Sequence, residues 1–298
     1  MSQTTVGLVG LGRMGQAVAP RLLEAKFNLA VWNRTASRCE EFRLKGAATP
    51  ATLEDLAARS AIILVFANAD GTRDVLTGAG GLLEGLRCPT VVALMGTFAP
   101  QEAIDLAARV TATGATCLDI PVLGTVGPAR AGQLVALAGG EKSAVQLMMP
   151  VLQTLCRRTV HVGPVGSASA LKLGHNLILT NYWRLIAETM AVAEGFGVAR
   201  NTILDVLSDS PAGLPALRLK TPILLGTDSE VGFDVDAVHD EMELIARACR
   251  SLNLRLPLTE SAVEILNHMK IDDWGDRDVA SMALYLLSSI NLRQSSAP

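Results

Sequence analysis

The stretch VGLVGLGRMG, residues 6–15, decides the fold of this chain, because an apolar strand runs directly into a Gly-x-Gly-x-x-Gly turn. In such a turn Gly10 permits the sharp bend, Gly12 lets the backbone approach a pyrophosphate, and Gly15 lets the following helix pack on the strand. The first turn of that helix offers N–H groups and a favourable dipole to phosphate. The turn, with Leu11, Arg13 and Met14 between its glycines, is therefore predicted to bind a dinucleotide.

Short aliphatic runs alternate with helical stretches around and beyond this turn. The runs predicted as buried strands are Val6–Val9, Leu29–Val31, Ile62–Phe66, Val91–Leu94, Thr116–Leu118, Leu134–Ala138 and Thr159–Val162. The stretches predicted as helices between them are Ala17–Ala25, Ser37–Leu44, Leu53–Ala58 and Pro100–Thr111. Repeated strand–helix units of this size imply an α/β fold with a doubly wound parallel sheet, the Rossmann arrangement.

The pattern changes at the turn-rich segment Gly163–Ser167, beyond which strand signals vanish. One long helix is predicted from Ala168 to Phe196. Further helical stretches are Thr202–Leu207, Val238–Leu252 and Thr259–Met269. The sequence thus predicts a Rossmann domain over residues 1–163 and an all-helical substrate and dimerisation domain over 164–298, joined by the long helix.

The end of the second predicted strand indicates which dinucleotide is bound. NAD-binding turns usually carry an acid there that bonds the ribose 2′-hydroxyl. This chain has Asn33-Arg34-Thr35 instead, with no carboxylate to repel a 2′-phosphate and with Arg34 able to hold one by charge-assisted hydrogen bonds. We therefore expect the cofactor to be NADP(H).

Composition excludes several other classes of protein. The 298 residues are 49% hydrophobic and 18% charged, which is typical of a globular chain, and the net charge of -3 argues against a nucleic-acid or membrane-surface partner. No apolar run approaches the ~20 residues of a membrane span, and the first residues lack the features of a signal peptide, so we expect a cytoplasmic protein. The five scattered cysteines are expected to be buried thiols, and the four histidines have no metal-ligand spacing, so no metal site is predicted.

Two further motifs lie downstream of the glycine turn, and with it they span nearly the whole of the first domain and the start of the long helix. They are Asp119–Thr125 with Gly132 and Gly139-Gly140 downstream, and Gly163–Asn176, which contains Lys172-Leu173-Gly174-His175-Asn176. Together with Gly10–Gly15 they resemble the β-hydroxyacid dehydrogenase family, which includes NADPH-dependent glyoxylate and succinic semialdehyde reductases. The resemblance implies that Lys172 is the catalytic lysine and that the helical domain forms a homodimer.

Lys172 and Asn176 also carry a chemical argument of their own. Four residues apart on a helix, their side chains face the same way, and we expect them to face the cleft between the domains. Hydride transfer to a carbonyl creates an alkoxide, which needs a proton donor and a nearby positive charge. The Lys172 ammonium supplies both, and Asn176 can hold the lysine or the substrate hydroxyl in place.

The resemblance also implies the walls of the pocket. Ala67-Asn68-Ala69 corresponds to the loop beside the nicotinamide ribose, Thr97 follows Gly96 where the family usually has Ser-Thr, and Phe233 matches an aromatic residue ahead of the last functional helix. On the Lys172 helix, Trp183 is expected in the core or at a subunit interface.

Two departures from the family pattern concern the substrate. The loop that usually reads Ser-Gly-Gly is Leu123-Gly124-Thr125 here, and Leu123 cannot donate a hydrogen bond to a substrate carboxylate. Asp240 takes the place of a family lysine, although His239 fits that place if the register shifts by one. Both changes point to a neutral, larger or more apolar carbonyl compound, or to an imine.

The sequence therefore predicts an NADPH-dependent oxidoreductase that reduces a small aldehyde or keto acid, or oxidises the matching hydroxy acid. Lys172 is its general acid or base, and the predicted substrate-binding residues are Leu123, Gly124, Thr125, Lys172, Asn176, Phe233 and Asp240. Two alternatives stay open, an imine reductase or reductive aminase on the same scaffold and a non-catalytic dinucleotide-binding module.

Overall fold

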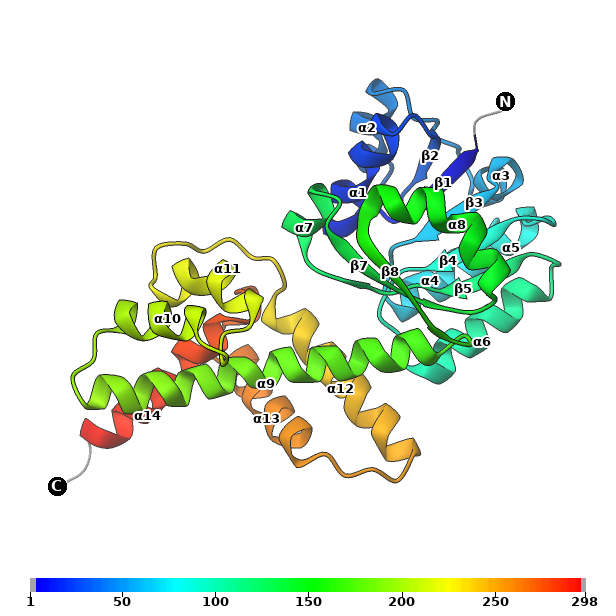
Figure 1. Cartoon of the computed structure of the whole chain (residues 1–298). Coiled ribbons are helices and arrows are strands. Elements are labelled where there is room, and N and C mark those ends of the chain that lie inside the picture. The colour runs from blue at the N-terminus through cyan, green and yellow to red at the C-terminus, as the bar shows by residue number, and fades with distance from the viewer. Residues whose placement is uncertain (1–3, 296–298) are drawn as a thin grey trace. The chain divides into compact units, whose positions relative to one another are not determined.

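The computed structural model describes residues 4–295 and divides into two compact units. The first unit ends at Gly174 and the second begins at His175, so the division falls inside helix α9 (Ser167–Gly195). This helix is the longest ribbon in Figure 1 and coincides within one residue at each end with the predicted long helix.

The first unit is built on an eight-stranded sheet. Its strands are β1 (Thr5–Val9), β2 (Asn28–Trp32), β3 (Ile62–Val65), β4 (Val91–Leu94), β5 (Thr116–Asp119), β6 (Val122–Leu123), β7 (Leu134–Gly139) and β8 (Cys156–Gly163). They lie in the order β2-β1-β3-β4-β5-β7-β6, and β8 pairs with β7. Every strand predicted from an aliphatic run is present, and the Rossmann fold is confirmed.

The sheet is mainly parallel, with a departure at one edge. Strand β7 runs antiparallel to both β5 and β6, whereas the sequence predicts parallel strands throughout. The connection from β6 to β7 holds only the short helix α7 (Val126–Arg130), and a parallel crossover needs a dozen or more residues. A short connection therefore returns the chain in the opposite direction.

Both faces of the sheet are covered by helices, as a doubly wound fold requires. Along β3, Ile62 and Leu64 enter one hydrophobic core while Ile63 and Val65 enter the other, because successive side chains of a strand point to opposite faces. Helices α1 (Arg13–Glu24) and α8 (Lys142–Leu155) contribute to the first core, and α3 (Leu53–Arg59) and α6 (Pro100–Thr111) to the second. The remaining helices of the unit are η1 (Ala36–Cys39), α2 (Glu40–Leu44), α4 (Ala69–Thr77) and α5 (Leu82–Gly85).

Four helices of this unit are not predicted by the sequence pattern, namely α4, α5, α7 and α8. Each contains a residue that weakens a helical signal: Gly71 in α4, Gly85 in α5, Pro128 in α7 and Pro150 in α8. Tertiary packing stabilises these helices in spite of that local preference: α4 and α5 pack on each other, α7 packs on α1, and α8 packs on β8.

The second unit is all-helical, as predicted. After α9 come α10 (Arg200–Asp209), α11 (Pro215–Leu224), α12 (Val235–Ser251), α13 (Pro257–Ile271) and α14 (Ser281–Ser295). Helices α11 and α14 are additional to the predicted ones. Trp183 of α9 is 2% exposed and packs edge-on against Tyr182, so its expected place in the core is confirmed. Among residues 4–295 no helix is long and apolar enough to span a membrane.

The cysteines are free thiols, but they are not all buried. Cys39, Cys117 and Cys156 are buried, and burial raises the pKa of the Cys156 thiol to about 12. Cys88 is exposed because it lies in the loop before β4, so the expectation of buried thiols is wrong for this residue.

Candidate active site

The three glycines of the predicted phosphate turn have different surroundings. Gly10 has φ +94, and a Cβ there would lie 2.2 Å from the carbonyl oxygen of Phe66. A Cβ on Gly15 would lie 1.9 Å from the carbonyl oxygen of Gly10. At Gly12, by contrast, no described heavy atom lies within 4 Å of such a Cβ. The outer glycines are therefore required by packing, and the middle one faces open space that a ligand can fill.

The start of helix α1 is suited to a phosphate. Its N-cap is Gly12, and no described side chain caps the helix there. First-turn N–H groups of a helix have no intrahelical acceptor, and a bound anion satisfies them. The open cradle at Gly12 and this helix terminus together fit the pyrophosphate of a dinucleotide.

Asn33 supports the turn. The backbone N–H of Leu11 donates to Asn33 Oδ1 at 2.9 Å, and Asn33 Nδ2 donates to the carbonyl oxygen of Thr35 at 3.0 Å. The side chain thus ties the end of β2 to the glycine turn at the end of β1. It fixes the shape of the loop on which a cofactor would rest.

Exposed arginines surround this loop. Arg34, at the end of β2, and Arg13, at the start of α1, are both exposed. Arg38, which is not among the residues predicted from the sequence, reaches the turn with its guanidinium 3.4 Å from the carbonyl oxygen of Leu11. Its place four residues after Arg34 is the signal that could have found it. Arginine side chains at these three positions are able to pair with phosphate groups.

The loops after β3 and β4 lie against each other. Asn68 caps α4, since its Oδ1 accepts the N–H of Gly71 at 2.9 Å, and Ala67 and Ala69 flank it. A Cβ on Gly96 would lie 2.0 Å from the carbonyl oxygen of Ala67. The close approach of this loop leaves no room for a side chain at Gly96, and Thr97 is the hydroxyl at this position.

Lys172 reaches the predicted substrate loop. Its Nζ donates to the carbonyl oxygen of Val122 at 3.1 Å, directly before Leu123-Gly124-Thr125. Gly124 has φ +122, a conformation that favours glycine, and Thr125 is the N-cap residue of α7. The structure therefore brings the predicted lysine and the predicted loop together in the first unit.

A buried carboxylate holds the helix that carries Lys172. Asp119, fully buried at the end of β5, accepts hydrogen bonds from Gly166 N–H (3.1 Å), Ser169 N–H (2.9 Å) and Ser169 Oγ (2.8 Å). Burial raises the pKa of Asp119, and these hydrogen bonds act in the opposite direction. The sequence gives Asp119 as part of a motif but does not predict this contact, which fixes the first turn of α9.

In the second unit, the α12 residue that contacts Asn176 is Glu241. Asn176 is buried, and its Nδ2 donates to Glu241 Oε2. Asp240, the predicted substrate residue, is exposed and lies next to His239, with 3.3 Å between Oδ1 and Nδ1. The family resemblance leaves the register open between His239 and Asp240 and does not point to Glu241. Val238 and Met242 are both buried, so they mark the inner face of α12. Glu241, three residues after Val238, lies near that face, and this spacing is the signal that could have pointed to Glu241.

Phe233 is held at the start of α12 by a buried ion pair. Asp278 Oδ2 accepts from Lys220 Nζ at 2.5 Å and from the N–H groups of Gly232 and Phe233 at 2.9 and 3.3 Å. The carbonyl oxygen of Phe233 accepts the N–H of Val279 at 2.9 Å. The half-buried Phe233 therefore sits on a rigid segment of backbone.

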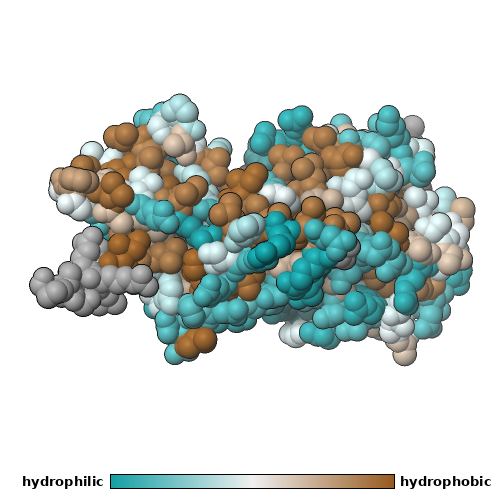
Figure 2. Space-filling model, turned by 90° about the horizontal axis from the view of Figure 1, so that it is seen from below, coloured by the Kyte–Doolittle hydropathy of each residue, from teal (hydrophilic) through white to brown (hydrophobic). Residues whose placement is uncertain are grey.

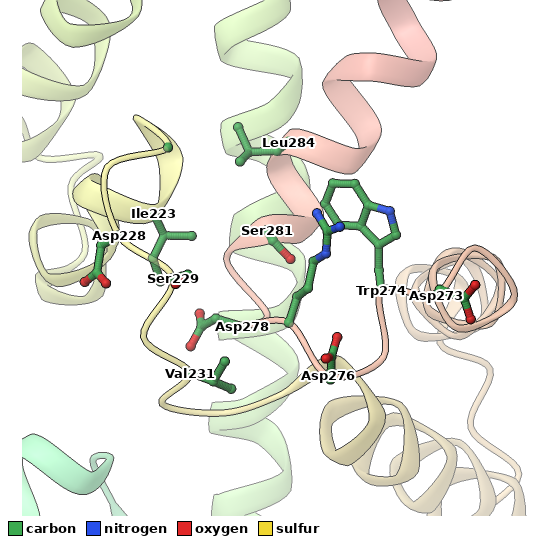
Figure 3. A pocket seen from close by; sticks show the side chains of 12 residues that line it. Ile223, Asp228, Ser229, Val231, Asp273, Trp274, Asp276, Asp278, Ser281 and Leu284 are labelled. Atoms are coloured by element: carbon green, nitrogen blue, oxygen red, sulfur yellow. The ribbon is translucent and has the colours of Figure 1, made fainter.

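Asp278 also lines a pocket of about 540 Å³ in the second unit. Figure 3 shows Ser281 and Trp274 on its walls, and the Arg277 guanidinium stacks 3.8 Å from the centre of the Trp274 ring. Among the described residues, those that line it do not include any predicted site residue. The pocket shares Asp278 with the segment that holds Phe233.

Comparisons with known proteins agree with the geometry. A family model described as the NAD binding domain of 6-phosphogluconate dehydrogenase matches residues 5–163. A second, described as NAD-binding of NADP-dependent 3-hydroxyisobutyrate dehydrogenase, matches residues 166–286. Together these two models cover most of both units.

Individual relatives are distant but cover nearly the whole chain. Glyoxylate/succinic semialdehyde reductase 2, chloroplastic, of Arabidopsis thaliana is 25% identical over 95% of this chain and 79% of its own. Cytokine-like nuclear factor N-PAC of Xenopus tropicalis is 26% identical over 93% of this chain, which spans about half (52%) of that protein.

Solved structures share the fold. Mycobacterium tuberculosis 3-hydroxyisobutyrate dehydrogenase superimposes with a TM-score of 0.86 at 23% identity, covering 95% of this chain and 99% of that one. An imine reductase from Myxococcus stipitatus superimposes with a TM-score of 0.64 at 20% identity, covering 95% and 99%. The fold is thus found in both a hydroxyacid dehydrogenase and an imine reductase.

Proposed function

The chain belongs to the β-hydroxyacid dehydrogenase family of NAD(P)-dependent oxidoreductases, and we propose that it reduces a small aldehyde or keto acid with NADPH, or oxidises the matching hydroxy acid. The observation that carries the proposal is the Lys172 ammonium, 3.1 Å from the carbonyl oxygen of Val122 and beside the loop Leu123–Thr125. The reduction of a carbonyl requires a proton donor and a positive charge near the oxygen that becomes an alkoxide, and the ammonium supplies both.

The protein's own residues then have distinct tasks. NADPH supplies the hydride when it is bound. Lys172 donates a proton to the carbonyl oxygen of the substrate, and the Val122 carbonyl group holds the ammonium in position. Asn176, one turn further along α9, orients the same substrate oxygen through its amide.

The substrate is proposed to be neutral or weakly polar at the end that faces Leu123. That side chain has no donor for a carboxylate, and α12 carries the acid Glu241 in contact with Asn176. Phe233 adds an apolar surface for the substrate. These features favour a larger or more apolar carbonyl compound over a small anionic one. The alternative substrate is an imine, because the fold is shared with an imine reductase.

A panel of substrates tests the proposed function directly. Consumption of NADPH is followed by absorbance with glyoxylate, succinic semialdehyde, an uncharged aldehyde and a cyclic imine, each over a range of concentrations. We expect turnover with at least one carbonyl compound and the highest kcat/KM with the uncharged aldehyde. If only the imine is turned over, the protein is an imine reductase and the proposal of carbonyl reduction is wrong. If no compound is turned over, the non-catalytic dinucleotide-binding alternative is supported.

We propose NADP(H) as the cofactor because Arg34 and Arg38 flank the glycine turn and residues 33–39 contain no carboxylate. One of the matching family models is also described as NADP-dependent. Replacing Arg34 by Ala is expected to raise the KM for NADPH on the order of 10–100-fold, the worth of one hydrogen bond to a charged group, and to leave that for NADH unchanged. Arg59→Ala, which removes an exposed arginine at the end of α3, is the matched control. Equal changes for both cofactors would contradict the 2′-phosphate role.

We also propose that two copies assemble through the long helix α9 and the helical unit to which most of it belongs. Leu171, Ile178, Leu185 and Val192 recur at every seventh residue of α9 and are between 49% and 63% exposed. A repeat of seven places side chains along one stripe of a helix, as helix–helix contacts require. Figure 2 shows that apolar areas, drawn in brown, lie among hydrophilic ones on the face in view.

For the compartment, we propose the cytoplasm. The support is the use of cysteine, since all five thiols are free and scattered, which is typical of a reducing environment.

A further inference from the structure

The amide of Asn176 is held at both ends by neighbouring side chains. Its Nδ2 donates to Glu241 Oε2 of α12, and Nδ1 of His175 lies 3.1 Å from its Oδ1. An ionised carboxylate can only accept hydrogen bonds, so the partner it faces must be the NH₂ group of the amide. Glu241 therefore dictates which way round the Asn176 amide stands.

Glu241 is itself well placed for this task. It lies on the partly buried side of α12, beside Met242, which is fully buried. The start of α12 is fixed by its N-cap, where Asp234 accepts the N–H of Ala237 at 2.8 Å. Glu243, two residues further on, lies next to Arg247 of the same helix at 3.7 Å. Of these two glutamates, only Glu241 contacts Asn176.

We infer that Glu241 is a positioning residue, which orients Asn176 so that a second N–H of the amide is directed at the substrate oxygen; the inference rests on the proposed role of Asn176 in carbonyl reduction. An amide nitrogen carries two hydrogens, and Glu241 takes one of them. The negative charge on Glu241 polarises the amide and strengthens the remaining N–H as a donor. Glu241 thus acts on the reaction through Asn176 and does not touch the substrate.

Replacing Glu241 removes the partner that selects the orientation of the amide, because Nδ1 of His175 can donate to the amide oxygen or accept from the amide NH₂ group according to its tautomer. With Glu241→Ala, the Asn176 amide can rotate and present its oxygen, which repels the developing negative charge on the substrate. Misplacement of a positioning group by about 1 Å can cost about 100-fold in rate. We expect Glu241→Ala to lower kcat on the order of 10–100-fold, with the KM for NADPH unchanged. Glu241→Gln keeps an acceptor of similar size, so it should retain more activity than Glu241→Ala.

A double-mutant cycle separates this role from a merely structural one. The chains compared are wild type, Glu241→Ala, Asn176→Ala and the double variant, and Glu243→Ala is the control on the same helix. If Glu241 acts through Asn176, the double variant is no slower than Asn176→Ala, because the group being positioned is already gone. Thermal melting of each variant reports whether it folds, and Glu241→Gln supplies the result if Glu241→Ala does not.

Each outcome has a defined meaning. Non-additive losses with an unchanged KM for NADPH support the inference. Wild-type kcat in Glu241→Ala and Glu241→Gln, or losses that multiply in the double variant, would overturn it while the proposed function stands. Wild-type kcat in Asn176→Ala would overturn the role of Asn176 and the inference with it. The substrate panel judges the proposed function on the wild-type chain alone, so the failures can be told apart.

Discussion

Replacing Lys172 by Ala is expected to lower kcat for carbonyl reduction by about 10²–10⁴-fold, the usual contribution of a general acid. The reason is the position of its ammonium, which donates to the Val122 carbonyl oxygen at 3.1 Å and so stands beside the substrate loop. Steady-state kinetics with the best substrate of the panel measures the loss. Fluorescence titration with NADPH measures cofactor binding, which should be unchanged because the glycine turn and its arginines are untouched.

Two further measurements distinguish a missing proton donor from a damaged site. A small primary amine added to Lys172→Ala should restore part of the activity, because it can enter the space left by the side chain and supply the proton. Lys172→Met, which keeps most of the aliphatic stem, should be as slow as Lys172→Ala if the charge and the proton are what matter. Lys142→Ala, at the exposed start of α8, is the matched control and should react at the wild-type rate. Unchanged turnover in Lys172→Ala would show that another group carries the proton.

Most of the fold could be predicted from the sequence because local and tertiary preferences agree there. The runs at residues 62–65 and 91–94 are continuous and aliphatic, as strands buried on both faces must be, and both are fully buried strands. The prediction fails where tertiary packing overrides local preference. Helix α8 forms despite Pro150, and β7 runs antiparallel because its connection is short. The aliphatic pattern misses the two-residue strand β6, and without it the link from β5 to β7 is long enough for a parallel crossover.

The candidate site shows the same limit at the level of side chains. Sequence motifs predict both Lys172 and the loop Leu123–Thr125. The structure brings the two together, since Lys172 Nζ donates to the carbonyl oxygen of Val122 directly before the loop. The partners Asp119 and Glu241 could not be predicted in this way. Each contacts a residue 50 or 65 positions away along the chain, and such contacts depend on how helices pack. In a helix that turns by about 100° per residue, a register error of one position moves the predicted contact to Asp240, which is exposed.

The glycine turn provides the second large effect, since Gly12→Ala and Gly15→Ala should fail for different reasons. At Gly15 a Cβ would lie 1.9 Å from the carbonyl oxygen of Gly10, so backbone must shift. We expect a loss of about 3 kcal/mol in the free energy of unfolding, reduced by at most about 1 kcal/mol from the better helix propensity of alanine. At Gly12 the backbone is extended, with φ -73 and ψ -167, and no described heavy atom lies within 4 Å of a Cβ. Gly12→Ala should therefore fold with wild-type stability.

Binding of NADPH gives the complementary result, because the methyl group of Gly12→Ala would occupy the cradle that the pyrophosphate needs. Overpacking costs about 1–3 kcal/mol, which corresponds to a Kd raised on the order of 10–100-fold. Titration calorimetry measures the Kd and urea denaturation the stability, with Gly195→Ala, where a Cβ also meets open space, as the control. Normal NADPH binding by a folded Gly12→Ala would mean that the cofactor does not approach the backbone at Gly12. Since Gly15→Ala loses stability even without cofactor, the pair separates the glycine that shapes the turn from the glycine that admits the ligand.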